Sequence, residues 1–334
     1  MINSEIQEMA ASKMIFVTSI FLLIPRGFVA AAIWQEEWTY DGISGPMFWG
    51  RGLINPEWSL CSKGKRQSPI DIDPNTLLFD PNLKPLKLDK ILINGVLVNA
   101  GHSLLFGIDN SSRPILNISG GPLLYKYEFH QLSLHFGLLN DRGSEHTING
   151  KAFPLEIQVY GYNVDLYNSY DEAMESPQGI VAISVLIGIG ESTSEDLAIL
   201  LDQLKNVEYK NQEVTVKRIS IAEMLPETQN YITYEGSMTT PGCQETVTWI
   251  VMNKPGYITA DQMDALRRVR RNDLGGPPAP LANNYRPIQN TFDRLIRTNI
   301  DFPSVKGRNC ITMKGSTTYR ANSLNSGRPN DILL

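Results

Sequence analysis

Short apolar or alternating runs, separated by clusters of Gly, Pro, Asn and Asp, recur along the chain from Trp34 to about Val305. Runs of this kind predict β-strands joined by turns, because successive side chains on a strand point to opposite faces of a sheet. The clearest runs are ILINGVLVNAGHSLLFGI, LEIQVYGYN, GIVAISVLIGIG and TVTWIVMN. The pattern therefore predicts one mainly β domain with a few short helices, which we place at residues 33–306.

Two segments have a helical pattern instead. The first covers about residues 194–207. Ser192 before it and Glu195 near its start have the spacing of a capping box. The second begins after Thr259, and Gln262 completes a capping box there as well. Three apolar residues at every third position predict the core-facing side of this second helix: Met263, Leu266 and Val269.

The N-terminus has a different hydrophobic pattern. An apolar run, MIFVTSIFLLI at residues 14–24, is followed by PRGFVAAA, which is rich in small residues. A run of this length is too short to span a bilayer and is typical of a signal peptide; a buried core helix is the alternative. The preceding segment carries two glutamates and one lysine, which leaves Met9 and Met14 open as start sites. We expect a signal peptide at residues 1–32 and a secreted protein without a membrane anchor.

Charge and short motifs agree with an extracellular route. The chain has 30 basic and 35 acidic residues, a formal net charge of −5, and no basic stripe. This balance argues against a nucleic-acid surface. The triplets NSS and NIS make Asn110 and Asn117 candidate glycosylation sites. Three cysteines suit one disulfide and one leftover thiol in an oxidising compartment.

Residues 131–147, QLSLHFGLLNDRGSEHT, have the pattern of a metal-binding strand with one expected side chain missing. Residues i and i+2 of a strand share a face, about 7 Å apart, so Ser133 and His135 should face the same space. Two histidines at that spacing, with a third from a neighbouring strand, would form an open zinc site. Because the first position here is serine, two interpretations stay open. The strand belongs either to a zinc enzyme with an unusual ligand set or to a protein with the same fold and a different function.

Eight motifs occur in order along the chain: FWG, GKRQSPIDI (64–72), NAGHS (99–103), HFG (135–137), GSEHT (143–147), TYEGSMTTPGC (233–243), TWIVMN (248–253) and NYRPIQ (284–289). With these motifs the chain resembles the α-class carbonic anhydrases over nearly all of its mature length. The resemblance implies a large, twisted, mostly antiparallel central sheet with a conical cavity reaching its middle.

In active members of that family three histidines hold a catalytic zinc, and the matching positions here are Ser133, His135 and Gln158. Serine and glutamine are weak oxygen donors compared with imidazole, thiolate or carboxylate. We therefore expect no bound zinc and no carbon dioxide hydration. His130 cannot fill the gap by strand parity, since it lies five residues before His135 and should face the other side unless a bulge intervenes.

The resemblance assigns roles to further residues. Thr239 and Glu145 match the hydrogen-bonded pair that orients a zinc-bound hydroxide, and His102 matches the residue that exports the product proton. Without a metal these groups have no nucleophile to serve. We interpret Thr239 and Glu145 as a buried pair whose polar groups hydrogen-bond to each other, and His102 as a surface loop residue.

Two structural features also follow from the resemblance. His146 matches a buried imidazole held by a glutamate and a tyrosine, which are Glu156 and Tyr234 here. Cys61 and Cys243 lie near the pair that closes extracellular family members, so we expect a disulfide between them.

The segment after about Gly307 is polar and poor in packing residues, which predicts a mobile C-terminal tail at residues 307–334. Cys310 lies in this tail and would be the unpaired cysteine. Intermolecular pairing and capping by a small thiol are the two alternatives for it.

Among the non-catalytic branches of the family, the chain is most similar to the secreted X and XI subgroup of carbonic anhydrase-related proteins. The stretches LCSKGKRQSPIDI and NISGGP and the polar C-terminal extension carry this closer match. It implies a secreted, catalytically inactive binding protein of the nervous system, with a presynaptic receptor of the neurexin type as its extracellular partner. Two alternatives stay open: a zinc hydratase with an improvised metal site, and a small-molecule carrier that uses a metal-free cavity.

Overall fold

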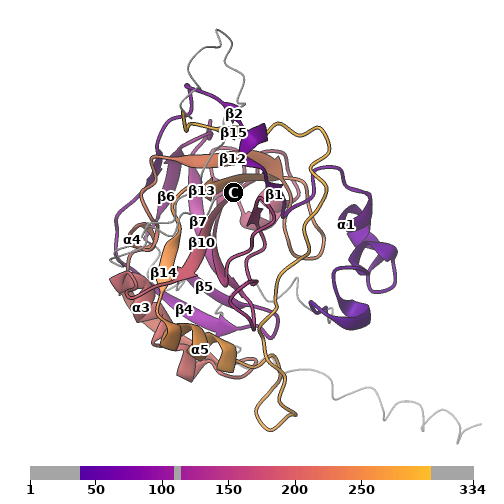
Figure 1. Cartoon of the computed structure of the whole chain (residues 1–334), viewed down its shortest axis with the longest axis vertical. Helices are drawn as coiled ribbons and strands as arrows, with labels where there is room; N and C mark the ends of the chain where they lie inside the picture. Colours follow the sequence, from indigo (N-terminus) through magenta and orange to yellow (C-terminus); the bar gives the residue numbers. More distant parts are fainter. Residues whose placement is uncertain (1–37, 109–113, 302–334) are drawn as a thin grey trace, which may run out of the picture. The chain divides into compact units, whose positions relative to one another are not determined.

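The structure is a computed structural model that describes residues 38–108 and 114–301. Strands are the main secondary structure in this part of the chain. The predicted signal peptide at residues 1–32, the predicted tail at 307–334, Asn110 and Cys310 lie outside the described residues. Figure 1 shows the described residues in colour, with the strands gathered around the middle of the picture.

Thirteen of the described strands form one mixed sheet. The main path runs β11 (Glu213–Ile219), β4 (Ile93–Asn99), β5 (Leu104–Ile108), β7 (Tyr127–Phe136), β9 (Leu155–Asn163), β10 (Ile180–Ile189), β13 (Val247–Met252), β12 (Tyr231–Gly236), β15 (Arg297–Thr298) and β2 (Leu78–Phe79). Off this path, β14 (Gly256–Ile258) pairs with β10, and β6 (Asn117–Gly120) joins β3 (Leu86–Leu88) to β7. Most pairs are antiparallel; β10 with β13, β10 with β14 and β15 with β2 are parallel. The predicted mainly β fold is confirmed.

Two further strands, β1 (Asp71–Ile72) and β8 (Thr147–Ile148), form a separate parallel pair. The described helices are short: α1 (Leu60–Lys63), α2 (Tyr170–Met174), α3 (Glu195–Leu201), α4 (Ile221–Met224) and α5 (Ala260–Arg268), with 3-10 turns η2 (Gly42–Ser44), η3 (Trp49–Arg51), η4 (Pro56–Ser59), η5 (Pro74–Thr76) and η6 (Leu204–Asn206). Helix α5 has the predicted capping box between Thr259 and Gln262. Its predicted core stripe is buried: Met263, Leu266 and Val269.

The other predicted helix is shorter than expected and begins differently. The N-cap residue of α3 is Ser194, so the predicted capping box at Ser192 is wrong. The neighbouring Thr193 hydroxyl instead hydrogen-bonds to Gln262 at the start of α5. After Leu201 the backbone tightens into i to i−3 hydrogen bonds and continues as η6, which ends the α-helix before residue 207.

The two faces of the sheet differ in chemistry. On β9, Leu155, Ile157 and Val159 join a large apolar core, which also contains the buried side chains of α3, α4 and α5. Figure 1 shows these three helices grouped on one side of the strands. The alternate residues Glu156 and Gln158 point to the other face, where a smaller core surrounds buried polar groups. Strand alternation therefore places the buried polar side chains of β9, Glu156 and Gln158, on one side of the sheet.

Strand β7 contains a bulge at His130. Phe129 pairs with Gly161 and Gln131 with Tyr160, so His130 is an extra residue without a partner position on β9. Its ring stacks on Tyr170 at a centroid distance of 3.7 Å and meets Tyr162 edge-on. The parity prediction for His130 is corrected, because the bulge breaks the alternation on which it rested. Burial lowers the pKa of His130 to about 4, and its described ring contacts are with these tyrosines, not with His135.

Candidate functional site

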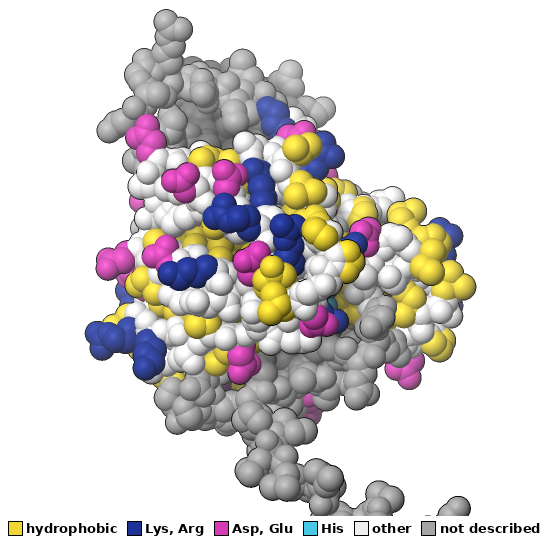
Figure 2. Space-filling model, turned by 90° about the horizontal axis from the view of Figure 1, so that it is seen from below, with side chains coloured by type: hydrophobic (Ala, Val, Ile, Leu, Met, Phe, Trp, Pro, Cys, Tyr) yellow, Lys and Arg dark blue, Asp and Glu magenta, His cyan; other side chains and the backbone are white. Residues whose placement is uncertain are grey.

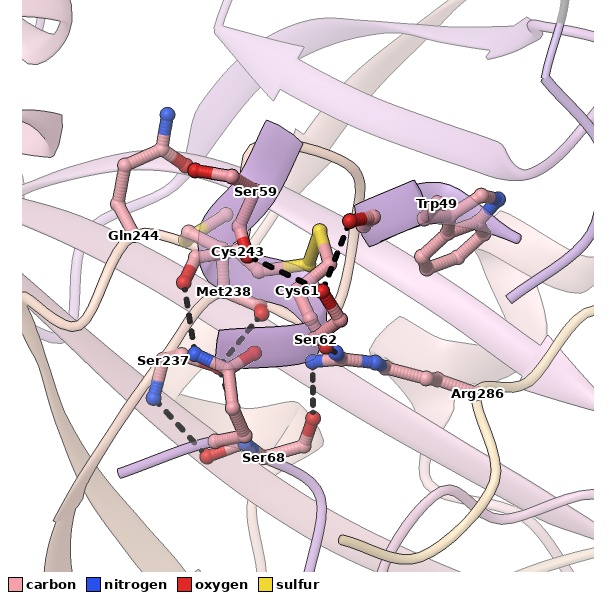
Figure 3. Close-up of a disulfide and its surroundings, with 12 residues drawn as sticks. Trp49, Ser59, Cys61, Ser62, Ser68, Ser237, Met238, Cys243, Gln244 and Arg286 are labelled. Carbon is pink, nitrogen blue, oxygen red and sulfur yellow. Dashed lines mark hydrogen bonds between the residues drawn. A yellow bond between two sulfur atoms is a disulfide. The ribbon is translucent and has the colours of Figure 1, made fainter. Parts of the chain in front are cut away.

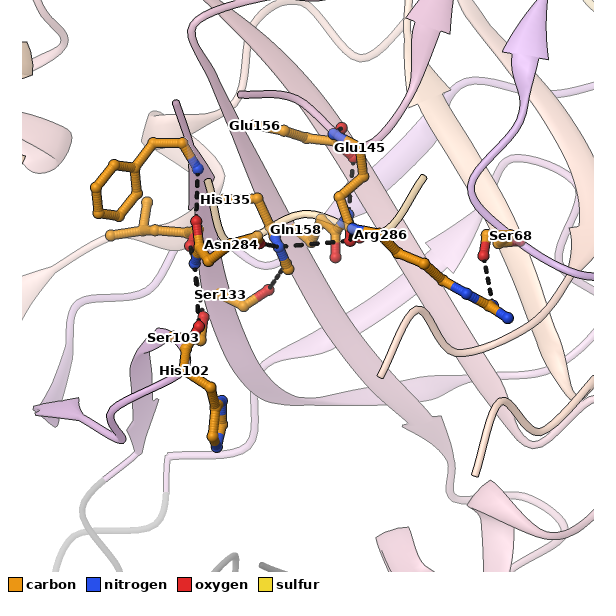
Figure 4. Close-up of polar contacts among 12 residues, drawn as sticks. Ser68, His102, Ser103, Ser133, His135, Glu145, Glu156, Gln158, Asn284 and Arg286 are labelled. Atoms are coloured by element: carbon orange, nitrogen blue, oxygen red, sulfur yellow. Dashed lines mark hydrogen bonds and ion pairs between the residues drawn. The ribbon is translucent and has the colours of Figure 1, made fainter. Parts of the chain in front are cut away.

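The three positions that the resemblance matches to zinc ligands lie together on adjacent strands. Ser133 of β7 pairs directly with Gln158 of β9, and His135 follows two residues later on the same face. All three are buried: Ser133 is 4% exposed, His135 1% and Gln158 0%. Figure 4 shows His135 and Ser133 turned toward each other beside Gln158. The structure therefore brings together the residues that the sequence singled out.

Both ring nitrogens of His135 have partners. Nδ1 lies 2.7 Å from the backbone carbonyl oxygen of Asn284, and Nε2 lies 3.1 Å from Ser133 Oγ. A carbonyl oxygen only accepts hydrogen bonds, so Nδ1 carries a proton. In the neutral ring Nε2 is then the acceptor, and the Ser133 hydroxyl donates to it. Glu145 Oε1 also faces Nδ1, at 3.6 Å.

Gln158 has a full set of hydrogen bonds. Its Nε2 donates to Glu145 Oε2 at 2.8 Å and to Glu156 Oε1 at 2.9 Å, while its Oε1 accepts from the Tyr160 hydroxyl at 2.6 Å. A side-chain amide nitrogen has two hydrogens to donate, and both are used here. Gln158 therefore joins two buried carboxylates that would otherwise repel each other.

The expected hydrogen bond between Glu145 and Thr239 is absent. Glu145 Oε1 accepts from the backbone nitrogen of Arg286 at 2.8 Å, and Oε2 accepts from Gln158. The buried Thr239 hydroxyl makes no hydrogen bond to Glu145 and interacts with the Tyr160 hydroxyl instead. The prediction of a mutually satisfied pair is thus wrong: Glu145 accepts from Gln158 and from the Arg286 backbone nitrogen instead of from Thr239.

A second network surrounds His146. Its Nδ1 lies 2.8 Å from Glu156 Oε1 and its Nε2 lies 2.7 Å from the Tyr234 hydroxyl. Ser184 and the backbone nitrogens of residues 145 and 146 also donate to Glu156. Burial alone would raise the pKa of Glu156, but His146 and these hydrogen bonds outweigh it and lower that pKa to about 2. These are the partners that the resemblance implies for His146.

His102 is a partly exposed loop residue. It lies between β4 and β5, and its ring stacks on Trp38 at a centroid distance of 4.3 Å. Burial, Lys210 and His135 together lower the pKa of His102 to about 3. An imidazole with this pKa stays neutral at physiological pH and is a poor proton shuttle there. The loop position is as expected, and the stacked Trp38 ring and the low pKa distinguish His102 from a fully exposed histidine.

Three further residues complete the site and were not singled out by sequence reasoning. The Asn284 side chain accepts from the Phe136 backbone and donates to the Leu134 carbonyl, which fixes the carbonyl that holds His135. Tyr40 packs edge-on against the His135 ring at a centroid distance of 6.4 Å, and its buried hydroxyl makes no hydrogen bond. Burial and Glu145 raise its pKa. Arg286 is the third.

Arg286 links the site to the disulfide. Its side chain is 2% exposed and donates from Nη2 to the Cys61 carbonyl at 3.0 Å and from Nη1 to the Ser68 carbonyl at 2.7 Å. Burial lowers its pKa to about 10, so it remains charged. Figure 3 shows Arg286 reaching toward Ser68 and the Cys61 loop. Cys61 and Cys243 are joined, which confirms the predicted disulfide.

These side chains do not fit a zinc ion. The oxygen of Gln158 accepts from Tyr160, its nitrogen is a donor, and the free lone pair of His135 accepts from Ser133. Within residues 38–108 and 114–301, no group of three His, Cys, Asp or Glu side chains converges in a way that could hold a metal. One imidazole with two neutral neighbours is not a donor set that zinc prefers.

Asn117, the one candidate glycosylation site among the described residues, lies on β6. Its Nδ2, the atom that would carry a glycan, donates to Asp89 Oδ2 at 2.7 Å. Glycosylation of Asn117 stays a prediction. No helix in the described part of the chain is both long and apolar enough to cross a membrane.

The sequence model of the eukaryotic-type carbonic anhydrase family matches residues 44–300. The chain therefore belongs to the eukaryotic-type carbonic anhydrase family. Carbonic anhydrase-like protein 2 of Caenorhabditis elegans is 40% identical over 270 residues, which cover 79% of this chain and 80% of that protein. Carbonic anhydrase-like protein 1 of the same organism is 34% identical over 330 residues, which cover 79% and 90%.

Proposed function

We propose that this chain is a secreted member of the family without hydratase activity, acting as an extracellular binding partner. Gln158 carries the proposal. Its amide is fully engaged with Tyr160, Glu145 and Glu156, where the resemblance implies a zinc ligand in catalytic members. Without a bound hydroxide there is no nucleophile for carbon dioxide. The names of the two nematode relatives, carbonic anhydrase-like proteins, agree with a place outside the standard enzymes.

Metal analysis tests the loss of zinc chemistry. Protein purified without chelators should contain substoichiometric zinc and hydrate carbon dioxide no faster than buffer. The variant Ser133→His with Gln158→His should bind zinc, because positions 133, 135 and 158 share one face of adjacent strands. Either single substitution supplies only two imidazoles and should bind far less. One tightly bound zinc in the natural protein would contradict the proposal.

The double variant should have weak hydration activity at best. A zinc-binding imidazole at position 158 keeps one N–H, whereas Gln158 now donates to both Glu145 and Glu156. Thr239 does not hydrogen-bond to Glu145, so the pair that would orient a hydroxide is also lost. Stopped-flow hydration assays with saturating zinc measure this. Activity near that of an established carbonic anhydrase would show that the pocket is better preserved than these contacts indicate.

A surface on the N-terminal segment suits protein binding. Ile43, Met47 and Leu53 are 81%, 66% and 71% exposed, and the segment around them packs as η3, η4 and α1. Figure 2 shows hydrophobic side chains gathered at the right edge of the view, on the side where α1 lies in Figure 1. Exposed apolar groups in one region are typical of interaction sites. The disulfide suits an oxidising compartment, which supports secretion.

Crosslinking of the purified protein on cells tests the partner, and the neurexin-type receptor implied by the resemblance is the first candidate. Ile43→Asp with Leu53→Asp should reduce cell-surface binding at least tenfold. Leu274→Asp is the matched control, since Leu274 is 73% exposed on the loop after α5. Equal loss in the control, or none in either variant, would reject this surface.

A further inference from the structure

Basic side chains gather around α1, next to the disulfide. Lys63 ends α1, and Lys65 and Arg66 follow in the run KGKR; all three are exposed. Two neighbours extend this group: the exposed Arg51 of η3 and the half-buried Arg294 of the loop before β15. We call these five residues the basic cluster. We propose that it binds a sulfated polysaccharide, and this proposal rests on the extracellular role proposed above.

Arg51 and Lys63 come from neighbouring turns of the N-terminal segment. The Ser62 hydroxyl donates to the Gly50 carbonyl at 2.8 Å, so the residues that follow these two, Lys63 and Arg51, lie close together. Arg51 lies over the Phe48 ring, 5.5 Å from its centroid, and this contact leaves its N–H groups available to an anion. In the described part of the chain neither cation forms an ion pair. Figure 1 shows α1 at the right-hand edge of the coloured chain.

Arg66 and Arg294 form the other half of the basic cluster. Arg294 Nη2 donates to the Gln67 carbonyl at 2.7 Å, directly after Arg66 in the chain. The hydrogen bonds of Arg294 to described residues all go to backbone carbonyls, so no carboxylate bonds to its guanidinium. Burial lowers the pKa of Arg294, Tyr234 and Glu245 oppose this, and Arg66 lowers it further. Two guanidinium groups that repel each other favour an added anion beside them.

Three glutamates lie near the basic cluster and do not cancel its charge. Glu245 Oε1 accepts from the Arg66 backbone nitrogen at 2.6 Å and from Gln67 Nε2 at 3.0 Å. Its Oε2 lies 3.6 Å from Arg66 Nε, which is longer than a hydrogen bond. Glu57 and Glu235 are exposed, and within residues 38–108 and 114–301 neither forms an ion pair with the cluster. The surface therefore has a local excess of positive charge, although the net charge of the chain is −5.

Sulfate groups repeated along a linear sugar chain match this arrangement. Arginine presents a planar fork of donors to an oxyanion, and lysine presents a mobile point charge. An exposed ion pair contributes little alone, so a ligand must engage several cations at once. A polysaccharide with a sulfate on most of its sugars supplies such a row of anions. Binding should weaken as salt increases, because ions screen exposed charges over about 8 Å at physiological ionic strength.

The experiment uses the full secreted chain with its disulfide intact. The probe is a fluorescent heparin octasaccharide, the ligand control is the same sugar after complete desulfation, and anisotropy measures Kd. The natural chain should bind the sulfated probe more tightly than the desulfated one. Lys63→Gln with Lys65→Gln and Arg66→Gln should raise Kd at least about tenfold, because three exposed ion pairs are lost together.

A matched variant separates the basic cluster from net charge. Lys84→Gln with Lys87→Gln and Lys90→Gln removes three exposed lysines on and around β3, so the net charge changes by the same amount. Its Kd should change by less than about twofold. Glu57→Gln removes an acid beside the cluster and should lower Kd, a gain that misfolding cannot produce. Thermal unfolding shows which variants are folded.

Several results would overturn the proposal. These are equal affinity for the sulfated and desulfated probes, an unchanged Kd in the cluster variant, and equal weakening in the two triple variants. Tighter binding to phosphatidylserine vesicles or to duplex DNA, lost in the cluster variant, would assign the cluster to a different anion and would also reject the polysaccharide. None of these outcomes bears on zinc content or on the cell-surface test with Ile43 and Leu53, so the proposed function can stand if this inference fails.

Discussion

His146 and His135 are both buried histidines on the polar face of the same sheet, but their surroundings differ. His146 lies between a carboxylate and a phenol at 2.8 and 2.7 Å, and Glu156 receives hydrogen bonds from several other groups. His135 is held by a backbone carbonyl and a serine. The nearby hydroxyl of Tyr40 is buried and makes no hydrogen bond.

This difference separates a structural network from a pocket that has changed its chemistry. A network in which every member is satisfied makes the fold rigid, and each partner is costly to remove. A site with an unpaired buried hydroxyl has fewer hydrogen bonds to lose when a side chain is replaced. We therefore expect mutations to be far more damaging around His146 than around His135, and the following predictions test that contrast.

The largest effect should come from the disulfide, which both regions share through Arg286. Cys61 and Cys243 are 182 residues apart, for which the chain-entropy model gives about 5 kcal/mol. Cys61→Ser with Cys243→Ser should lose most of that free energy of unfolding in urea. Hydrogen exchange should rise first at the backbone N–H of Arg286, which bonds to Glu145, and later at that of His146. The reverse order would contradict the contrast.

Glu156→Gln should cost about 3–5 kcal/mol of unfolding free energy. The change leaves His146 beside a neutral amide and adds hydrogens where Gln158 and Ser184 already donate. Glu235→Gln is the control, because the exposed Glu235 accepts from the Thr248 hydroxyl only, at 3.2 and 3.3 Å to its two oxygens. It should change stability by less than about 1 kcal/mol. An equal loss of unfolding free energy in the two variants would show that the His146 network contributes no more to stability than an exposed carboxylate.

Acid should destabilise the His102 region in a measurable way. The pKa of His102 falls from its ordinary value of 6.5 to about 3 on folding. Between these values the unfolded chain binds more protons, so stability decreases as pH falls from 6.5 toward 3. His102→Phe should reduce the slope of unfolding free energy against pH by at most about 1.4 kcal/mol per pH unit. Unchanged slopes between pH 6 and 4 would show that His102 is solvated.

The smallest effect should come from Thr239→Val. The two side chains have nearly the same shape, and the Thr239 hydroxyl has no hydrogen bond to Glu145 to lose. Its contact is with the Tyr160 hydroxyl, which keeps its own hydrogen bond to Gln158. Removing it should leave stability unchanged or raise it by about 1 kcal/mol. Ser184→Ala, which removes a 2.7 Å bond to Glu156, should instead cost about 1 kcal/mol. If Thr239→Val is the more damaging change, the hydroxyl has a role that these contacts do not reveal.

Local sequence signals predicted the features that depend on neighbouring residues. Helix α5 follows from its capping box and apolar stripe, and the shared face of Ser133 and His135 follows from strand alternation. Helix α3 shows the limit. Ser192, Thr193 and Ser194 all resemble cap residues, and the tertiary contact of Thr193 with α5 helps decide among them.

The rest of the site depends on long-range contacts that carry no periodic signal. Arg286 reaches Cys61, 225 residues away in sequence, and Asn284 reaches His135 from a segment with no regular secondary structure. NYRPIQ could be recognised as a motif, but nothing local indicates that its backbone would take the oxygen of Glu145 expected to bond to Thr239. Such substitutions of one partner for another become visible only in the folded chain.

The bulge at His130 acts on β7 as a frameshift acts on a coding sequence. Before it, the odd-numbered residues Tyr127 and Phe129 belong to the large apolar core; after it, the even-numbered Leu132 and Leu134 do. Alternation counted from the start of the strand would therefore bury Ser133 and His135 beneath the helices. Deleting that one residue would exchange the faces of everything on one side of it. A strand without this bulge would need a gap at position 130 before its ligand positions could be compared with those of β7.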